Sequence, residues 1–460
     1  MEGGTSYGII SLIPVAVIII TAVITKKTFQ SMFLGLVVGF IILGENLLDA
    51  FNLFLDSMFK VMANENTIWV ILICGLFGSL TMLMEKSGGV HGFSSITERI
   101  IKTRKSALLG TWILGIIVFV DDYLNALVVG SAMRKITDKF KISREMLAYI
   151  INSTGVTVCA IVPFSTWSAF MSGLMEQSDM TGGLSPTAAY ISTIPYIVYG
   201  WLAVILVPLF ALRILPLIGP MKKAEERTIE TGQVLSEASK QALADSESEI
   251  AATSTTKNRA INFLAPIILL AIITVVTEDI LLGLFASLGL CFVLYLIQRV
   301  MKFGEYFDNI IAGLTDMFPV LVLIILAYMF QDVNKGLGLT DYVIGIAMDN
   351  VNPSLLPLII FVVISFLSFA TGTFWGLAAI AFPIVAPLAS AMSVNPFLCA
   401  GALISGVAFG GHICLYSDTV ILASASTKVT NADYFNTSFP LVVVPFILAC
   451  IIFLILGFVM

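Results

Sequence analysis

Three carboxylates lie in stretches of sequence that are otherwise apolar. Asp121 and Asp122 belong to FVDDYLN at 119–125, and Asp418 belongs to YSDT at 416–419. A carboxylate near the centre of a bilayer costs roughly 2.5–3.5 kcal/mol, so three charged, lipid-facing groups would cost on the order of 8–10 kcal/mol. These side chains must therefore face a polar cavity, carry a proton or bind a cation. We expect Asp122 and Asp418 to bind a sodium ion or a proton in turn, and the alternative for Asp121 or Asp122 is capping of a helix.

Oxygen-bearing and flexible residues accompany the carboxylates. Hydroxyl, amide and backbone oxygens suit a hard cation such as sodium, whereas a desolvated carboxylate can carry a proton instead. Hydroxyl residues and glycines also occur simply where helices pack closely. Three roles stay open for the histidine of this set: titration, contact with a substrate, or satisfaction of freed backbone groups. The candidate binding residues, besides the three carboxylates, are Asn125, Ser153, Thr154, Ser165, Thr166, Thr371, Gly372, Thr373, Ser405, His412, Ser417 and Thr419.

The composition indicates a membrane protein. Hydrophobic residues make up 58% of the 460 residues and charged residues only 12%, about half the charged share of soluble domains. Apolar runs such as 66–84, 280–297 and 437–460 are long enough to cross the lipid as helices, and the alternation of barrel strands is missing. We therefore expect an all-α polytopic membrane protein whose partner is the lipid bilayer. No basic arm suggests nucleic acid, and six scattered cysteines suggest neither a metal site nor a disulfide. We expect no resident cofactor.

The sequence also contains a distant repeat of itself. Pro14 corresponds to Pro266, Lys86 to Lys335, and FVDDYLN at 119–125 to FATGTFW at 369–375, at offsets of 249 to 252 residues. Duplicated apolar chains with polar residues at matched depths are typical of secondary transporters. We expect a first transmembrane repeat at 1–218, a linker at 219–259 and a second repeat at 260–460.

The positive charges predict the topology. Basic clusters flank residues 106–133 on both sides, which violates the positive-inside rule if this stretch crosses once. We therefore expect re-entrant hairpins at 106–133 and 355–390, entering from opposite faces. Ten spans then place both termini outside the cytoplasmic membrane and the linker inside, so that two inverted repeats each have five spans plus a hairpin.

Two of these spans should be broken helices at the midplane. We expect Gly155, Pro163 and Ser165-Thr166 to interrupt the span after the first hairpin. Gly406, Gly410, Gly411 and residues 417–419 should interrupt the span after the second. A broken helix presents carbonyls to a cation and amides to an anion. The polar linker reads as a disordered or loosely helical tether.

FVDDYLN, NSTGVTV…PFSTW, GTFWGLAAIAFPIVAPLA and GGHICLYSDT together resemble the NhaC-type sodium/proton antiporter family over nearly the whole chain. The resemblance implies a transporter rather than an enzyme. Hairpin tips and broken spans would carry the ions and slide against a scaffold, an elevator-type movement, commonly within a homodimer. Relatives of this type exchange sodium and protons alone, or move amino acids or small organic acids coupled to those ions. Because Thr-Gly-Thr at 371–373 supplies no carboxylate matching Asp122, the two halves would not form equivalent ion sites.

Two other classes fit less well. Motifs of intramembrane hydrolases such as HExxH and GxGD are absent from the sequence. A channel would share the polar midplane but would gain nothing from inverted hairpins.

Overall fold

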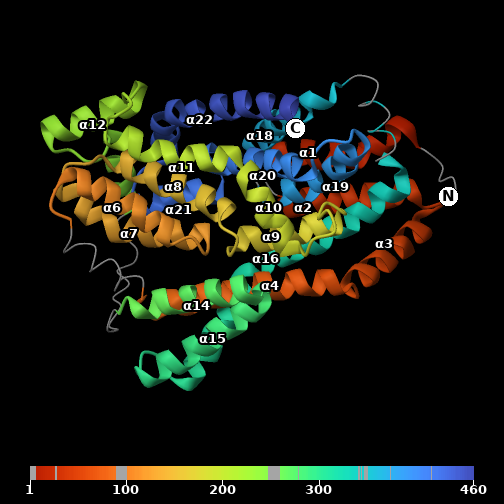
Figure 1. Cartoon of the computed structure of the whole chain (residues 1–460), viewed down its shortest axis with the longest axis horizontal. Helices are drawn as coiled ribbons and strands as arrows, with labels where there is room; N and C mark the ends of the chain where they lie inside the picture. Colours follow the sequence, from red (N-terminus) through yellow and green to blue (C-terminus); the bar gives the residue numbers. More distant parts are fainter. Residues whose placement is uncertain are drawn as a thin grey trace.

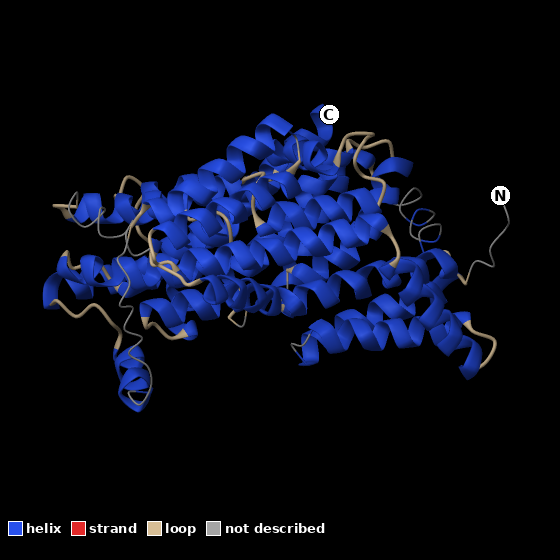
Figure 2. Ribbon diagram, turned by 90° about the horizontal axis from the view of Figure 1, so that it is seen from below, coloured by secondary structure: helices blue, strands red, loops and turns tan. Residues whose placement is uncertain are grey.

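The computed structural model describes residues 7–460 except 26–27, 90–100, 247–258, 278, 340–341, 343, 345, 347–350, 373 and 416. Every regular element in this part of the chain is a helix, and the ribbon contains no strand there (Figure 2). The expected all-α class is confirmed.

The helices lie before, within and after the segment 219–259 that the sequence predicts to be a linker. The first half contains α1 (Ile13–Thr25), α2 (Thr28–Leu43), α3 (Leu47–Met62), α4 (Glu65–Lys86), α6 (Arg104–Ile117), α7 (Asp122–Lys139), α8 (Arg144–Ile161), α9 (Thr166–Gln177), α10 (Pro186–Thr193) and α11 (Val198–Ala211). Two helices follow in the predicted linker, α12 (Gly219–Thr231) and α13 (Glu237–Ser246). The second half contains α14 (Ile261–Thr277), α15 (Ile280–Ile297), α16 (Phe303–Leu337), α18 (Leu356–Thr371), α19 (Trp375–Ala391), α20 (Pro396–Ile413), α21 (Asp418–Thr427) and α22 (Asn431–Val459).

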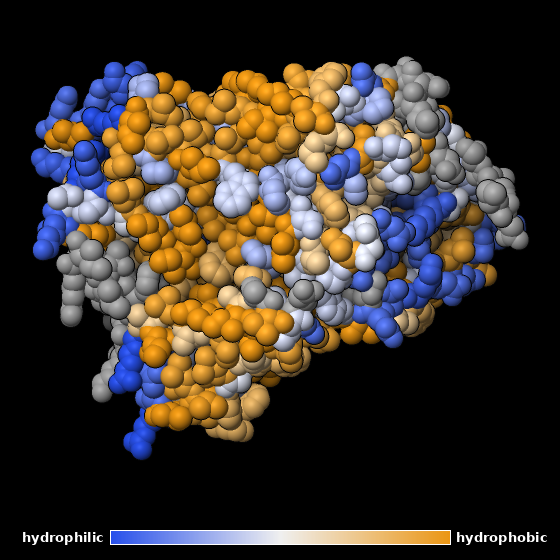
Figure 3. Space-filling view, viewed as in Figure 1, coloured by the Kyte–Doolittle hydropathy of each residue, from blue (hydrophilic) through white to orange (hydrophobic). Residues whose placement is uncertain are grey.

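The chain is a multi-pass membrane protein. Among the described residues, five helices are long and apolar enough to cross a bilayer, or seven if each bent pair counts as one span. Four shorter apolar helices accompany them. A broad apolar belt covers the middle of the surface, and hydrophilic side chains gather at its two ends (Figure 3). The long helices run between these ends (Figure 1), which is the arrangement that lipid requires.

Helices α6 and α7 form a hairpin that begins and ends at one end of the molecule. The Arg104 guanidinium, in the first turn of α6, donates to the carbonyl of Lys141, just beyond the end of α7, at 3.4 Å. Thr154 of α8 lies against Gly115 of α6 so closely that a methyl group at position 115 would overlap its hydroxyl. The tip, residues 118–121, falls where the sequence predicts the chain to turn back.

Helices α18 and α19 form a second hairpin at the opposite end. Helix α18 runs beside α20 in the same direction, because Ile364 contacts Gly406 and Ser368 contacts Gly410. Helix α19 must therefore return to the end where α18 begins. Helix α22 links the two ends: Ser239 of the linker donates to Asp433 near its start at 2.6 Å, and Gly457 near its end touches the Ser354 carbonyl at the base of α18. The two hairpins thus open toward opposite ends of the molecule.

Two spans are interrupted at positions near those predicted, but not by the predicted glycines. Helices α8 and α9 are bent by 41° across residues 162–165, and α20 and α21 are separated by residues 414–417. Gly155, Gly406, Gly410 and Gly411 lie inside helices instead. At Gly410, for example, any side chain would overlap Ser368, so this glycine serves close helix packing.

The first part of the linker is more ordered than expected. Helix α12 lies at the left end of the molecule in Figure 1, beside the base of the first hairpin. Its buried Glu225 pairs with Arg104 and accepts a hydrogen bond from the Ser143 amide at 2.9 Å. Its Arg227 forms a two-pronged pair with buried Glu145 at 2.9 and 3.0 Å. The prediction of a plain tether is therefore wrong for α12; residues 247–258 of the linker lie outside the described residues.

Candidate functional site

Asp121 closes the tip of the first hairpin. It is the N-cap of α7, and its carboxylate accepts the Leu124 amide at 2.9 Å. The same carboxylate accepts the Thr166 hydroxyl at 3.1 Å, and the Thr166 amide donates to the carbonyl of Val120 at 3.0 Å. Asp121 is thus the capping member of the carboxylate pair, and it ties the hairpin tip to the first turn of α9.

Asp122 has the opposite environment. Only 1% of the residue is exposed, and neither carboxylate oxygen has a hydrogen-bond partner among the described residues. The negative charges of Asp121 and Asp418 both act on it. A buried carboxylate without partners is strongly unfavourable as a bare anion. This side chain therefore needs a proton or a cation.

Tyr123 connects the first hairpin to the second broken span. Its hydroxyl donates to Asp418 Oδ2 at 3.1 Å. Asp418 is the first residue of α21, which packs against α7 so closely that Ser426 fills the space beside Gly130. Unlike Asp122, Asp418 is open to its surroundings. The three carboxylates therefore gather around one hairpin tip, with Asp418 at the accessible side and Asp122 inside.

The two broken spans are closed by equivalent serines. Ser165 is the N-cap of α9 and donates its hydroxyl to the carbonyl of Cys159 at 2.6 Å. Ser417 is the N-cap of α21 and donates to the carbonyl of Gly411 at 2.9 Å. Each serine thus reaches the carbonyl six residues earlier, which the break has freed. Thr419 adds a second bond to the Gly411 carbonyl at 2.7 Å.

Two further candidates, Asn125 in the first hairpin and Thr154 in α8, make hydrogen bonds to backbone carbonyls. The amide of Asn125 donates to the carbonyls of Gly115 and Val118 at 2.6 and 2.8 Å, which joins the start of α7 to the end of α6. Thr154 donates back to the carbonyl of Ile150 within its own helix at 2.8 Å. The bonds of both residues are structural.

His412 lies in a buried polar network beside the carboxylates. Its Nε2 meets the Ser153 hydroxyl at 2.8 Å and its Nδ1 meets the Tyr199 hydroxyl at 2.7 Å. Its carbonyl accepts bonds from Asn152 and Tyr434 at 2.8 and 2.7 Å. With both ring nitrogens bonded and 1% of the residue exposed, His412 serves to join four helices. Ser405 belongs to the edge of the same network, since its hydroxyl accepts the Tyr199 amide at 3.4 Å.

Aromatic side chains close the site from the second hairpin. Thr371 donates to the carbonyl of Leu367 at 2.8 Å, and Gly372 ends α18 in the left-handed conformation, with φ of 68°; Thr373 lies outside the described residues. Beyond this turn, Phe374 stacks on Trp167 with ring centres 4.9 Å apart. Trp375 lies 5.7 Å from Trp167, and neither indole nitrogen has a bonding partner among the described residues.

The Trp167 indole approaches Asp122 closely enough to act on its charge, although neither group completes a hydrogen bond. The carboxylate cluster therefore contains hydrogen-bond donors and acceptors that have no partner among the described residues and are available to a bound ion or solute. The described residues hold no group of three or more histidine, cysteine or acidic side chains that could bind a metal ion. A cation at Asp122 would thus depend on hydroxyl and backbone oxygens as well as carboxylates.

Sequence reasoning did not single out Tyr123, Asn152, Tyr199 or Tyr434. Tyr123 stands inside the FVDDYLN motif, so its place beside the two aspartates was an available signal. The other three carry no local signal of this kind: a polar side chain indicates a hydrogen bond when it is buried, but the sequence does not name its partner.

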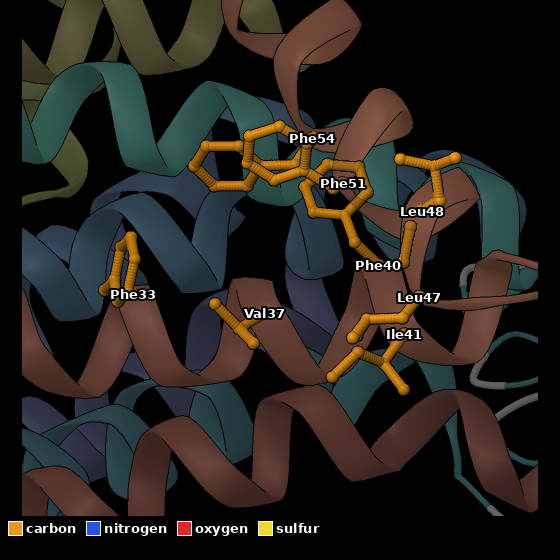
Figure 4. Close-up of a pocket in the computed structure, with 9 residues that line it drawn as sticks. Phe33, Val37, Phe40, Ile41, Leu47, Leu48, Phe51 and Phe54 are labelled. Atoms are coloured by element: carbon orange, nitrogen blue, oxygen red, sulfur yellow. The ribbon is translucent and has the colours of Figure 1, made fainter.

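A second feature of the described surface is apolar rather than polar. It is an apolar groove of about 680 Å³ between α2 and α3. Phe33, Val37 and Ile41 of α2 face Leu48 and Phe51 of α3 across it (Figure 4). Because no titratable side chain lines it, this groove cannot bind an ion.

Comparisons with known proteins agree on the class of molecule. The sequence matches the Na+/H+ antiporter family over residues 4–201 and 174–458. An uncharacterized protein of Haemophilus influenzae is 26% identical over 476 residues, which covers 95% of this chain and 88% of that protein. The malate-2H(+)/Na(+)-lactate antiporter of Bacillus subtilis is 28% identical over 121 residues, or 26% of each chain.

Two solved structures share the fold. The YdaH transporter of Alcanivorax borkumensis, described as having an unusual topology, superposes with a TM-score of 0.62 at 13% identity over 94% of this chain and 97% of its own. MtrF of Neisseria gonorrhoeae, described as one of a class of antimetabolite efflux pumps, gives a TM-score of 0.56 at 15% identity over 88% of this chain and 84% of its own.

Proposed function

This chain belongs to the Na+/H+ antiporter family and is a secondary transporter, and we propose that it exchanges sodium ions for protons across the cytoplasmic membrane. The observation that carries the proposal is the Asp122 carboxylate, buried and without a hydrogen-bond partner among the described residues. Such a group is stable only with a proton or a cation, and the two compete for the same oxygens. Competition of this kind is the basis of exchange.

In this proposal Asp418 is the carboxylate that an entering sodium ion contacts first. It is accessible and it accepts the Tyr123 hydroxyl, so a sodium ion that leaves water would meet Asp418 before Asp122. Ser417 and Thr419 lie beside it and contribute hydroxyl oxygens. Repulsion between the carboxylates favours occupation by one cation or one proton at a time.

The movement that we propose is alternating access of the elevator type. The mobile unit would consist of the two hairpins and the two broken spans, α6–α9 and α18–α21, and the scaffold would include α4, α14, α15 and α16. The bonds Tyr123–Asp418 and Ser153–His412 support this division, since each joins the two halves of the chain inside the mobile unit. Hairpins that open toward opposite ends, and serine caps at equivalent breaks, support two inverted repeats at 1–218 and 260–460.

The topology that we propose puts the linker 219–259 in the cytoplasm and both termini outside. Arg227 belongs to α12, and Arg104 pairs with Glu225 of the same helix, so both cations lie at the α12 end of the molecule. Lys60 of α3 pairs with Asp332 at 3.0 Å, and Lys335 lies one turn further along, in the last turn of α16. A concentration of positive charge at the α12 end is what the positive-inside rule requires. The homodimer expected from the family stays a prediction.

A second candidate function is coupled transport of a small organic solute. The matched segment of the Bacillus subtilis malate/lactate antiporter favours it, because that protein's name joins sodium and protons to organic acids. Under this alternative the carboxylate cluster would bind the driving ion, and the solute would bind elsewhere in the mobile unit or at its border.

The test is exchange in proteoliposomes that contain a pH-sensitive dye. A sodium gradient directed out of the lumen should acidify the lumen, a gradient directed into it should alkalinise the lumen, and both signals should vanish in Asp122→Asn. Asp308→Asn, a change of an exposed carboxylate in α16, is the matched control and should leave the signal unchanged. Full exchange by Asp122→Asn would refute the assignment.

A further inference from the structure

A polar recess of about 280 Å³ lies far from the carboxylate cluster, between the end of α9, the end of α16 and the middle of α19. Its polar lining consists of Ser178, Asp179, Gln331, Asn334 and Lys335. Helix α9 separates the two places: Thr166 at its start bonds to Asp121, and the Gln177 carbonyl at its end accepts the Gln331 amide at 2.8 Å. Twelve helical residues span about 18 Å, so the recess is a separate site.

The deep part of this recess contains polar groups without partners. Asn334 is 2% exposed, and neither its amide nitrogen nor its oxygen has a hydrogen bond among the described residues. The side-chain oxygens of Gln331 and Ser178 are also buried and unbonded. Buried polar atoms are nearly always satisfied by protein or water, and each such exception requires a reason. A polar ligand that bonds to them supplies one.

The rim of the recess carries two charges of opposite sign. Lys335 and Asp179 form no ion pair or side-chain hydrogen bond with any described residue. Lys335 lies one turn beyond Gln331 on α16, and Gln331, Asn334 and Lys335 all line the recess. Asp179 approaches from the turn after α9. A ligand with both a carboxylate and an ammonium group would complement this pair.

Two helix ends strengthen the attraction for an ammonium group. Helix α9 ends at Gln177 and helix α16 at Leu337, and the residues that directly follow these ends, Ser178, Asp179 and Gly338, line the recess. The carboxyl end of a helix carries about half a negative charge. Together with Asp179, these ends give the recess an excess of negative potential, which favours a zwitterion over a simple carboxylic acid.

The backbone at Asp179 shows that its side chain is not needed for the turn. Asp179 adopts the left-handed conformation, with φ of 56°, where glycine is the usual residue at the end of a helix. Its carboxylate makes no bond that would stabilise this conformation. Replacement by glycine should therefore preserve or stabilise the turn while it removes the charge.

From these observations we propose that the recess binds a small α-amino acid, with its carboxylate on Lys335 and Asn334 and its ammonium group on Asp179 and Gln331. The remaining wall is formed by Pro383 and Pro387 of α19, which suit a short apolar side chain. Because α16 belongs to the proposed scaffold and α9 and α19 to the mobile unit, the ligand would bridge the two. Binding itself does not depend on the sodium/proton exchange proposed above.

The test is calorimetric titration of the detergent-solubilised full-length protein with three molecules of nearly equal size: L-alanine, L-lactate and propionate. Alanine should bind saturably, lactate at least tenfold more weakly because it lacks the ammonium group, and propionate more weakly still. No saturable heat with alanine would overturn the proposal. Lactate that binds as well as alanine, or better, would overturn the zwitterion assignment and identify the recess as a hydroxy-acid site.

Variants then assign the contacts. Lys335→Gln and Asn334→Leu should each weaken the binding of alanine at least tenfold. Asp179→Gly should remove the preference for alanine over lactate without loss of thermal stability. Lys86→Gln is the matched control, because Lys86 occupies the corresponding last turn of α4 and is exposed. Asp122→Asn should bind alanine normally, so a failure of the ion-exchange proposal leaves this test intact. Unchanged alanine affinity in Lys335→Gln and Asp179→Gly would refute the site.

Discussion

The hydroxyl of Tyr123 donates to Asp418 across 295 residues of sequence, at 3.1 Å. This bond joins the tip of the first hairpin to the start of α21. It therefore couples the two halves at the point where three carboxylates gather, and it makes the hairpin tip respond to the charge of Asp418.

Replacement of Tyr123 by phenylalanine removes this bond and preserves the ring. A hydrogen bond of this kind contributes about 0.5–1.5 kcal/mol, so the exchange rate at subsaturating sodium should fall roughly two- to tenfold. The rate is measured with the dye-loaded proteoliposomes. Tyr342→Phe, which changes a tyrosine of the second half outside the cluster, should have no effect; an unchanged rate in Tyr123→Phe would show that Asp418 does not need the bond.

Asp122→Asn should separate stability from function. The variant loses a buried group that is unfavourable as an anion, so the apparent melting temperature without sodium should stay equal or rise. A ligand at 100 times its dissociation constant stabilises the protein by about 2.7 kcal/mol. The wild type should therefore melt at a higher temperature in sodium than in choline, and the variant should show no such difference. A sodium-dependent shift that persists in Asp122→Asn would move the ion site elsewhere.

The serine caps should be energetically equivalent. Ser165→Ala and Ser417→Ala each remove an N-cap and a buried bond to a freed carbonyl, at a cost of about 0.5–2 kcal/mol. Thermal unfolding in detergent should show similar decreases for both variants. Ser185→Ala removes a cap of α10 without a bond to a broken span and serves as the reference; a large difference between Ser165→Ala and Ser417→Ala would contradict the structural equivalence of the two breaks.

Replacement of two neighbouring glutamates of α12 should change the free energy of unfolding by very different amounts. Glu225 is 1% exposed and pairs with Arg104, whereas Glu226 is half exposed and forms only a 3.8 Å pair with Lys222. Glu225→Ala breaks a buried pair and should destabilise the protein by up to about 3–5 kcal/mol. Glu226→Ala should change stability by less than about 1 kcal/mol. Equal melting temperatures for the two variants would show that α12 does not fasten the first hairpin.

Local signals in the sequence predicted the breaks of the chain well. The paired aspartates at 121–122 and Thr371-Gly372 lie where the hairpins turn, because caps and left-handed glycines end helices. The position of Ser165 and Ser417 at breaks follows from the same capping chemistry. Glycine was a poor guide to the breaks, because Gly406 and Gly410 permit close packing of α18 on α20 instead.

Contacts between distant parts could not be read from one sequence. Nothing local distinguishes Asp121, which caps, from Asp122, which has no partner; the difference arises because Thr166 reaches only the first. The same holds for His412, whose two bonding partners come from α8 and α11. The polar composition of α12 did not predict that this helix packs on the first hairpin. Ion pairs with Arg104 and Glu145 hold it there, although it lacks a continuous apolar face.

The stacked rings of Trp167, Phe374 and Trp375 have one more consequence. Two of the five tryptophans in the chain lie in this stack, and the emission of an indole shifts with the electric field around it. The stack therefore places a natural fluorophore beside Asp122, the carboxylate that we propose to change its charge during exchange. Binding of an ion or a proton should change the wavelength or intensity of tryptophan emission, so the transport cycle can be followed in the unlabelled protein.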